Sequence, residues 1–340
     1  MTQLYGLQPL PVTLVFREVV DMSDNETLIG SVEPEIMGRI AERGEQIARG
    51  ASRSAALEAG LSIASVPVMI AALARDVGAQ ATSLSSVLNY ALMLEMFENE
   101  FYKAVLGMSS SSAQNAAFVA VRGKVNGVRG AMPALRQIQK HEASHIAFLE
   151  ANGAKNALNL TADSFDFTGG KGSGTGPFAG ATTDLVALLL TAQGVEDTGV
   201  RAFKGQAANL LAAGNTAVLE SALRIHSVEA RHASKIRRMR RQSGAPATVR
   251  LSGTISGGGS AAAGAGNVPG LPAAVISALE SIYANEENTM QAGMNVTTLP
   301  NLPSGINVMA AAQEAFDEPL TRAQVTAIVQ PFFKVAIPAA

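Results

Sequence analysis

The sequence predicts an all-α fold: a four-helix bundle with a long crossover, carrying extensions at both ends. First, four segments have apolar residues at a spacing of three and four, the pattern of an amphipathic helix. Second, Ala, Leu and Met are abundant while Trp is absent and Tyr numbers only 4, which favours helix over sheet. Third, a long glycine-rich connection separates the second and third helical segments. Such a connection is typical of a bundle whose chain must cross from one end to the other.

The first 80 residues are expected to form an N-terminal extension. Residues 55–74 are rich in Ala and Leu and follow Arg49 and Arg53, an order similar to the signal segment of exported proteins, although Glu58 interrupts it. The charge-free part, residues 61–74, is too short to span a bilayer easily. Two interpretations stay open. A retained anchor helix would place the protein in the periplasm or at a membrane, whereas an extra helix covering the bundle leaves a cytoplasmic protein as the alternative.

The bundle is expected over residues 81–243. Each of its four helices should turn one stripe toward the core, and each stripe includes acidic or imidazole groups among apolar ones. In chain order the stripes are Leu88, Ala91, Glu95, Glu98, Tyr102 and Val105; Leu135, Ile138, Glu142, His145 and Leu149; Leu185, Leu189, Ala192, Glu196, Gly199 and Phe203; and Val218, Ala222, Ile225, Glu229, His232, Ile236 and Met239.

Two of these stripes contain a Glu-x-x-His motif, one at residues 142–145 and one at residues 229–232. A spacing of three puts both side chains on one helix face, about 5–6 Å apart. One such motif often arises by chance on a solvated face, but two in apolar stripes indicate a shared site. Two such pairs, with one Glu from each of two further helices, make the ligand set of a carboxylate-bridged two-metal site.

Charge supports the same interpretation. An unpaired buried carboxylate costs several kcal/mol or shifts its pKa until it is neutral, so four in one core call for cations. Two divalent metals would balance four Glu charges. The predicted ligands are Glu95, Glu142, His145, Glu196, Glu229 and His232. The expected cofactor is two iron ions, with Mn or Zn as alternatives, because carboxylates suit Mn and imidazole suits Fe and Zn.

Three choices in this set depend on neighbouring residues. Glu196 is preferred to Asp197 because Asp197 falls on a polar stripe with Gln193 and Lys204. Glu98 shares its stripe with Glu95 and could bind a metal or lie just behind the ligands. Tyr102 lies two turns from Glu95 and is the candidate catalytic residue, supplying an electron or a hydrogen bond, with a core aromatic as the alternative.

Several segments resemble the ferritin-like domain family that includes desiccation-related proteins. Residues 88–102 resemble its first helix, residues 141–145 and 228–233 its second and fourth helices, and residues 316–320 the C-terminal part of bacterial members. The resemblance covers about residues 80–335. It implies a ferritin-like four-helix bundle and, mapped onto this sequence, the same six ligands.

Other features limit the function. The chain has no cysteine, which excludes disulfides, zinc-thiolate sites and thiol catalysis, and its net charge of −2 gives no reason to expect nucleic-acid binding. The crossover, about residues 152–182, contains the run Gly169 to Gly176, but its spacing does not fit a phosphate-binding loop. It is instead expected to connect parallel neighbouring helices.

The C-terminal third is predicted in three parts. The basic run Lys235 to Arg241 should stabilise the C-terminal end of the fourth helix electrostatically. Residues 244–270 are a Gly- and Ala-rich linker. Residues 271–340 are expected to form a helical extension that wraps the bundle or meets a neighbour. A helix is expected from Pro272 to Gly293. A capping box at Thr321 to Gln324 should start the last helix.

Two functions remain at this point. The first is a di-metal protein that reacts with O2 or peroxide. Its candidate reactions are ferrous iron oxidation or peroxide reduction in stress protection, or oxygenation of a small substrate. The second is a structural or interaction subunit on the same scaffold, docking through its extensions on another copy of itself or on a membrane complex, with the metal site silent.

Overall fold

The computed structural model describes residues 83–244, 271–300, 302 and 304–338. The predicted N-terminal extension with its anchor-like helix, and all of the predicted linker except Gly244, lie outside the described residues. Everything described belongs to one unit of the chain, Val66–Ala340. Within the described ranges, none of the helices combines the length and the apolar character that a membrane crossing needs.

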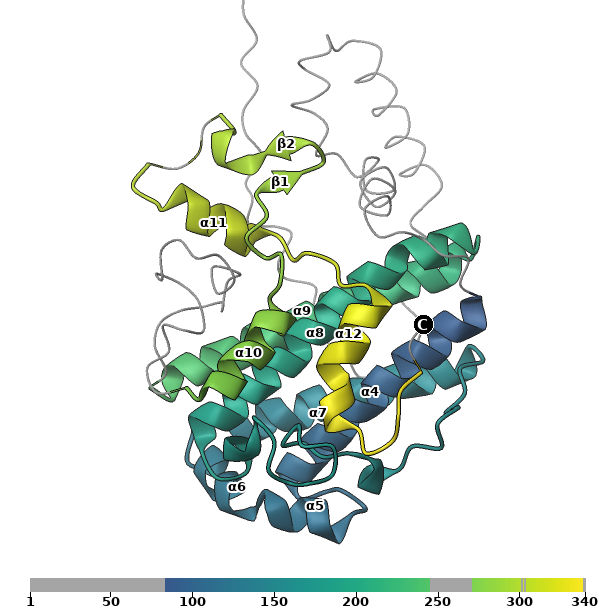
Figure 1. The fold of residues 1–340 in the computed structure, drawn as a ribbon, viewed down its shortest axis with the longest axis vertical. Helices are drawn as coiled ribbons and strands as arrows, with labels where there is room; N and C mark the ends of the chain where they lie inside the picture. Colours follow the sequence, from purple (N-terminus) through teal and green to yellow (C-terminus); the bar gives the residue numbers. More distant parts are fainter. Residues whose placement is uncertain (1–82, 245–270, 301, 303, 339–340) are drawn as a thin grey trace, which may run out of the picture. The chain divides into compact units, whose positions relative to one another are not determined.

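Four long helices form the bundle (Figure 1). They are α4 (Leu84–Leu106), α7 (Ala131–Ala151), α8 (Leu185–Ala212) and α9 (Thr216–Gln242). Contacts join α4 to α7, α7 to α9, α9 to α8 and α8 to α4, so the four helices form a closed ring. The all-α prediction is confirmed.

Polar side chains fix where the bundle helices begin. The side-chain oxygens of Ser83, Asp184 and Asn215 accept backbone N–H groups at the starts of α4, α8 and α9, at 3.2, 2.8 and 3.0 Å. These groups would otherwise lack a partner in the first turn. Gly107 ends α4 with a φ of +75°, which favours glycine.

The direction of each helix follows from one apolar cluster. Leu88 on α4 and Val218 on α9 precede the predicted ligands of their helices, whereas Leu149 on α7 and Leu210 on α8 follow theirs, and all four belong to the same cluster. Helices α4 and α9 therefore run in one direction and α7 and α8 in the other. The crossover joins parallel helices, as expected, but they are diagonal in the ring rather than neighbours.

The connections are short helices and an ordered crossover. Helices α5 (Ser112–Ala117) and α6 (Val119–Asn126) link α4 to α7, and the crossover contains 3-10 turns η3 (Ala162–Ser164) and η4 (Ala179–Thr182). The Asp166 carboxylate organises the glycine-rich loop, accepting hydrogen bonds from Thr168, Gly172 and Gly174 at 2.6–3.0 Å. A Cβ at Gly176 would lie 2.2 Å from backbone, so the tight loop itself explains that glycine.

The C-terminal segment is less helical than predicted. It contains α10 (Ala273–Ile282), the antiparallel pair β1 (Met290–Gln291) and β2 (Met294–Asn295), η7 (Val296–Thr298), α11 (Val308–Ala315), α12 (Arg322–Val329) and η8 (Gln330–Phe332). The predicted helix from Pro272 to Gly293 is wrong beyond Ile282, because Asn285 adopts a left-handed φ of +69° and the chain turns into the β-hairpin. The capping box of Thr321 and Gln324 is confirmed at the start of α12.

Buried polar groups hold this segment on α8. Arg201, 1% exposed, pairs with Glu286 at 3.0 Å and donates to the carbonyl oxygens of Ile282, Ala284 and Glu318. Asp197 accepts from Tyr283 Oη at 2.7 Å. The stripe of Gln193, Asp197 and Lys204 is therefore covered by the C-terminal segment.

The basic run at the end of α9 also contacts Asp197 on α8. Arg237 donates to Asp197 Oδ1 at 2.6 Å, and Arg240 is buried with 1% of its surface exposed. The expectation that this run serves mainly the helix terminus is thus incomplete, because part of it turns into the protein.

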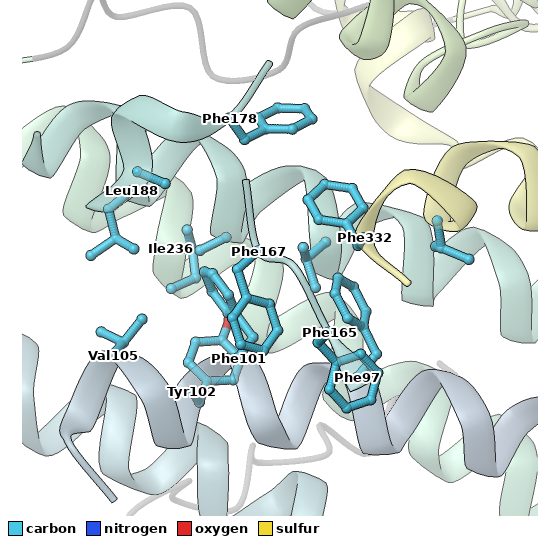
Figure 2. Packing of buried hydrophobic residues seen from close by; sticks show 14 of the residues in the cluster. Phe97, Phe101, Tyr102, Val105, Phe165, Phe167, Phe178, Leu188, Ile236 and Phe332 are labelled. Atoms are coloured by element: carbon cyan, nitrogen blue, oxygen red, sulfur yellow. The ribbon is translucent and has the colours of Figure 1, made fainter. Parts of the chain in front are cut away.

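Aromatic rings pack between α4, the crossover and the C-terminal segment (Figure 2). Phe97 and Phe101 of α4 meet Phe165 and Phe167 of the crossover and Phe332 of η8, with centroids 5.3 Å apart for Phe97 and Phe332 and 5.4 Å apart for Phe101 and Phe167. The cluster joins three parts of the chain that are distant in sequence.

Candidate metal centre

The six predicted ligands converge at the middle of the bundle. Glu95 comes from α4, Glu142 and His145 from α7, Glu196 from α8, and Glu229 and His232 from α9. The four carboxylates are completely buried, and His145 and His232 are 8% and 4% exposed. Because each helix contributes at one level, the ligands form a layer across the bundle.

Two overlapping groups make up this layer. In the first, His145 Nδ1 lies 3.2 Å from Glu95 Oε2, 3.2 Å from Glu142 Oε2 and 3.1 Å from Glu229 Oε1. In the second, His232 Nδ1 lies 3.0 Å from Glu142 Oε1, 3.4 Å from Glu196 Oε2 and 3.5 Å from Glu229 Oε2. Glu142 and Glu229 therefore give one oxygen to each group, as bridging carboxylates do.

The arrangement fits two metal ions. Ligand atoms in each group lie within 4.8 Å of one another. Ligands about 2.0–2.2 Å from a metal, at tetrahedral or octahedral angles, lie about 3.0–3.6 Å apart, which matches the observed spacings. Both oxygens of Glu142 and Glu229, with Glu196 Oε2 and His232 Nδ1, are buried without a hydrogen bond in the described structure. Such groups are costly unless a cation satisfies them.

The pKa values of the ligand residues are also shifted by burial and by neighbouring charges. Burial raises the pKa of Glu196 to about 8, and burial together with the charge of Glu229 raises the pKa of Glu95. Burial opposes the protonation of His145, but Glu142, Glu229 and Glu95 raise its pKa to about 12. Burial also opposes the charge of Glu229, yet His145 and His232 lower its pKa to about 2. Without a cation, the buried layer is thus held by contacts between imidazole and carboxylate groups and by carboxyls whose pKa values are shifted toward the neutral form.

Glu98 is a fifth buried carboxyl beside this layer. It belongs to neither ligand group, and Glu98 Oε1 would lie 2.7 Å from a Cβ at position 199, so Gly199 leaves the space it occupies. Burial, and then the charges of Glu229 and Glu95, raise its pKa. Of the two sequence-based alternatives, this position outside both ligand groups favours Glu98 behind the ligands.

Tyr102 touches the ligand layer directly. Its hydroxyl donates a short hydrogen bond to Glu196 Oε1, and the residue is completely buried. Glu196 therefore keeps its other oxygen, Oε2, for the group around His232. Of the two roles predicted for Tyr102, this geometry supports the hydrogen bond.

Sequence reasoning did not assign a role to His141. Its Nδ1 lies 2.8 Å from His232 Nε2, and the two rings stack with centroids 5.1 Å apart. A His232 that offers Nδ1 to a metal carries its proton on Nε2 and can donate it to His141, which fixes the orientation of the ring. The spacing of four between His141 and His145 was the available signal. His226 instead lies 3.0 Å from the carbonyl oxygen of Val200, away from the ligands.

Comparison with known families agrees with this geometry. Residues 83–242 match the family described as ferritin-like domain. These residues form a ferritin-like domain. The domain spans α4 to α9 and contains all six candidate ligands, His141 and Tyr102. No curated protein and no solved structure matches the chain significantly. The desiccation-related branch of the family stays a prediction.

Proposed function

We propose that the ferritin-like domain binds two metal ions, iron rather than Mn or Zn, and is an oxidoreductase that oxidises ferrous iron with O2 or peroxide. One observation carries the proposal: two groups of one imidazole and three carboxylates share Glu142 and Glu229, and most of their oxygens lack any other partner. Mixed nitrogen and oxygen ligands suit iron. Protection against oxidative stress would follow from this activity.

The chemistry of the bound group sets what the residues must do. Held by the six ligands, two ferrous ions would supply the two electrons that, with two protons, reduce O2 to hydrogen peroxide or peroxide to two molecules of water. Glu142 and Glu229 hold the two positions at a fixed separation. Tyr102 orients Glu196, His141 orients His232, and the complete burial of the carboxylates keeps bulk water away from the layer.

Metal content tests this proposal. Protein reconstituted anaerobically with ferrous iron should hold about two irons per chain by elemental analysis. Glu142→Gln should lower the content sharply because Glu142 serves both groups. Glu150→Gln, an exposed change on the same helix, is the matched control and should leave it unchanged. Equal iron content in Glu142→Gln and in the unchanged protein would contradict the proposal, whereas preferential retention of Mn or Zn would correct the choice of metal.

A scaffold role is the second candidate, and one observation favours it. The segment from β1 to α11 exposes large apolar side chains, each at least 36% accessible: Met290, Met294, Leu299, Leu302, Ile306 and Met309. Such a concentration can mark a protein contact. Iron-free protein that self-associates, or that captures a membrane complex, through this segment would support the role. Met290→Lys and Met309→Lys should then abolish the association without changing the fold.

A further inference from the structure

The ligand layer reaches solvent through its imidazoles. The four carboxylates of the layer have no exposed surface, whereas His145 on α7 and His232 on α9 both keep a little. The two rings lie with their centroids 6.4 Å apart. On the opposite side of the ring of helices, where α4 meets α8, Tyr102 is completely buried and Glu98 nearly so. The layer is therefore closed toward α4 and α8 and open toward the edge between α7 and α9.

A third imidazole continues this edge to the surface. His141 is partly exposed and lies one turn before His145 on α7. Its Nδ1 is 2.8 Å from His232 Nε2, and its Nε2 is 2.6 Å from the side-chain amide of Gln137, which is exposed. Rotation of that amide exchanges its nitrogen and oxygen, so the oxygen can equally face the imidazole. Gln137, His141 and His232 thus form a continuous series of nitrogen and oxygen groups from solvent to the layer.

Other parts of the bundle offer a hydrated ion apolar side chains instead. The pocket that all four bundle helices line is narrow and mainly apolar, and none of the six ligands lines it. Phe97 and Phe101 on α4 pack against rings of the crossover and the C-terminal segment. An ion that passed such surfaces would lose its water molecules without gaining ligands, which is costly. Among the described residues, the edge between α7 and α9 is therefore the polar approach to the layer.

We propose that ferrous ions enter and leave the layer between α7 and α9, and that His141, with Gln137, is the first group to bind them. This inference rests on the proposed function and adds how its metal arrives. Imidazole nitrogen is a good ligand for iron, whereas a side-chain amide oxygen is a weaker one. His141 contacts His232 on the side that faces away from the carboxylates. An ion held there by two groups can therefore pass on to the stronger set that includes Glu142 and His232.

A residue on the entry route changes rates but not the equilibrium. Because an ion enters and leaves by the same route, slower binding through His141 must be matched by slower release by the same factor, and the affinity stays as it was. A residue that only holds His232 in position changes the affinity instead. Measuring both rates therefore separates an entry role of His141 from a purely orienting one.

Cobalt(II) loading of the full chain measures both rates without oxygen chemistry. Co²⁺ takes the same nitrogen and oxygen ligands as ferrous iron, and its visible absorption reports binding. His141→Asn removes the imidazole but keeps an acceptor near the position of Nδ1 for His232. It should slow loading several-fold and slow release to a chelator by the same factor. Glu150→Gln, an exposed change on the same helix, is the control and should alter neither rate.

A second variant should change the rates in the opposite direction. Gln137→Glu places a carboxylate, a stronger ligand for divalent cations than an amide, beside His141 and should speed loading and release alike. Ala147→Glu adds the same charge at another exposed position of α7 and should change the rates much less. A gain in rate cannot come from a chain that fails to fold, and circular dichroism confirms the fold of every variant.

The outcomes distinguish this inference from the function on which it rests. Unchanged rates in both His141→Asn and Gln137→Glu would overturn the entry route. So would faster release with a lower affinity in His141→Asn, because His141 would then only orient His232. Both results would leave the di-metal proposal standing, since the chain would still bind its ions. A chain that binds neither cobalt nor iron would overturn the di-metal proposal and the entry route together.

Discussion

Two regions of the bundle differ in packing: a filled side, where phenylalanine rings pack between α4, the crossover and η8 (Figure 2), and a hollow side, where all four bundle helices line a narrow, mainly apolar pocket of about 20 Å³. The filled side draws Phe165, Phe167 and Phe332 from the crossover and the C-terminal segment, whereas the bundle helices alone line the hollow side. The difference teaches that the ligand layer is supported unevenly, because close packing on the filled side restricts the movement of the side chains there, whereas the hollow side leaves some room.

Removing one aromatic ring from each side should give the largest difference in unfolding free energy between the two sides. Phe101→Ala on the filled side should cost about 3–5 kcal/mol of unfolding free energy, because Phe101 is 1% exposed and contacts Tyr102, Phe118 and Phe167. Phe203→Ala on the hollow side should cost less, since Phe203 already borders empty space. Urea denaturation of metal-free protein measures both, and equal losses would show that the two sides are packed alike.

Enlarging one alanine on each side should give the next largest difference in unfolding free energy between the two sides. Ala104→Leu on the filled side should cost about 1–3 kcal/mol through overpacking, because Ala104 is completely buried in the main core. Ala222→Leu should cost less, because Ala222 is only half-buried and borders a narrow pocket. Thermal unfolding followed by circular dichroism gives both values. Equal losses in the two variants would show that the hollow side is packed as tightly as the filled side.

Two tyrosines provide a finer test. Tyr102→Phe should weaken iron binding by about 10–100-fold, because Glu196 loses the hydroxyl that orients it. Tyr90→Phe, on the hollow side, removes a hydroxyl that donates to Arg322 and should leave iron affinity unchanged. Competition with a chelator measures both affinities. Similar losses of iron affinity in the two variants would show that the Tyr102 hydroxyl does not orient Glu196.

The smallest effect should be a pH dependence on the filled side. Burial acts to raise the pKa of Asp166, but hydrogen bonds from Thr168, Gly174 and Gly172 hold it below its ordinary 3.8. Its contribution to stability is therefore present above pH 3.8 and is lost as the pH falls through the lowered value. The difference in unfolding free energy between the unchanged protein and Asp166→Asn should shrink between pH 7 and pH 3. A constant difference would show that the charge of Asp166 is not what the loop uses.

Most of the correct predictions came from the spacing of residues within a single helix. The register of Glu142 with His145 and of Glu229 with His232 is a property of a single helix, so periodicity was enough to place these residues in the core. The end of α10 and the role of Arg201 depend on contacts between α8 and a segment about 80 residues away in sequence, which no periodicity encodes. His141 was missed because its partner, His232, lies on another helix.

The contacts of Arg201 also make the matched domain depend on residues that lie outside the family match. The family match ends at residue 242, but α8 buries a guanidinium whose acceptors are the carbonyl oxygens of Ile282, Ala284 and Glu318. Gly205 on the same helix has no room even for a methyl group, since a Cβ there would lie 2.0 Å from the carbonyl oxygen of Leu320. A fragment trimmed to the residues that match the family would expose this face of α8 and remove the acceptors of the Arg201 guanidinium. We therefore expect a stable fragment of this chain to extend beyond residue 242 and to include the C-terminal segment.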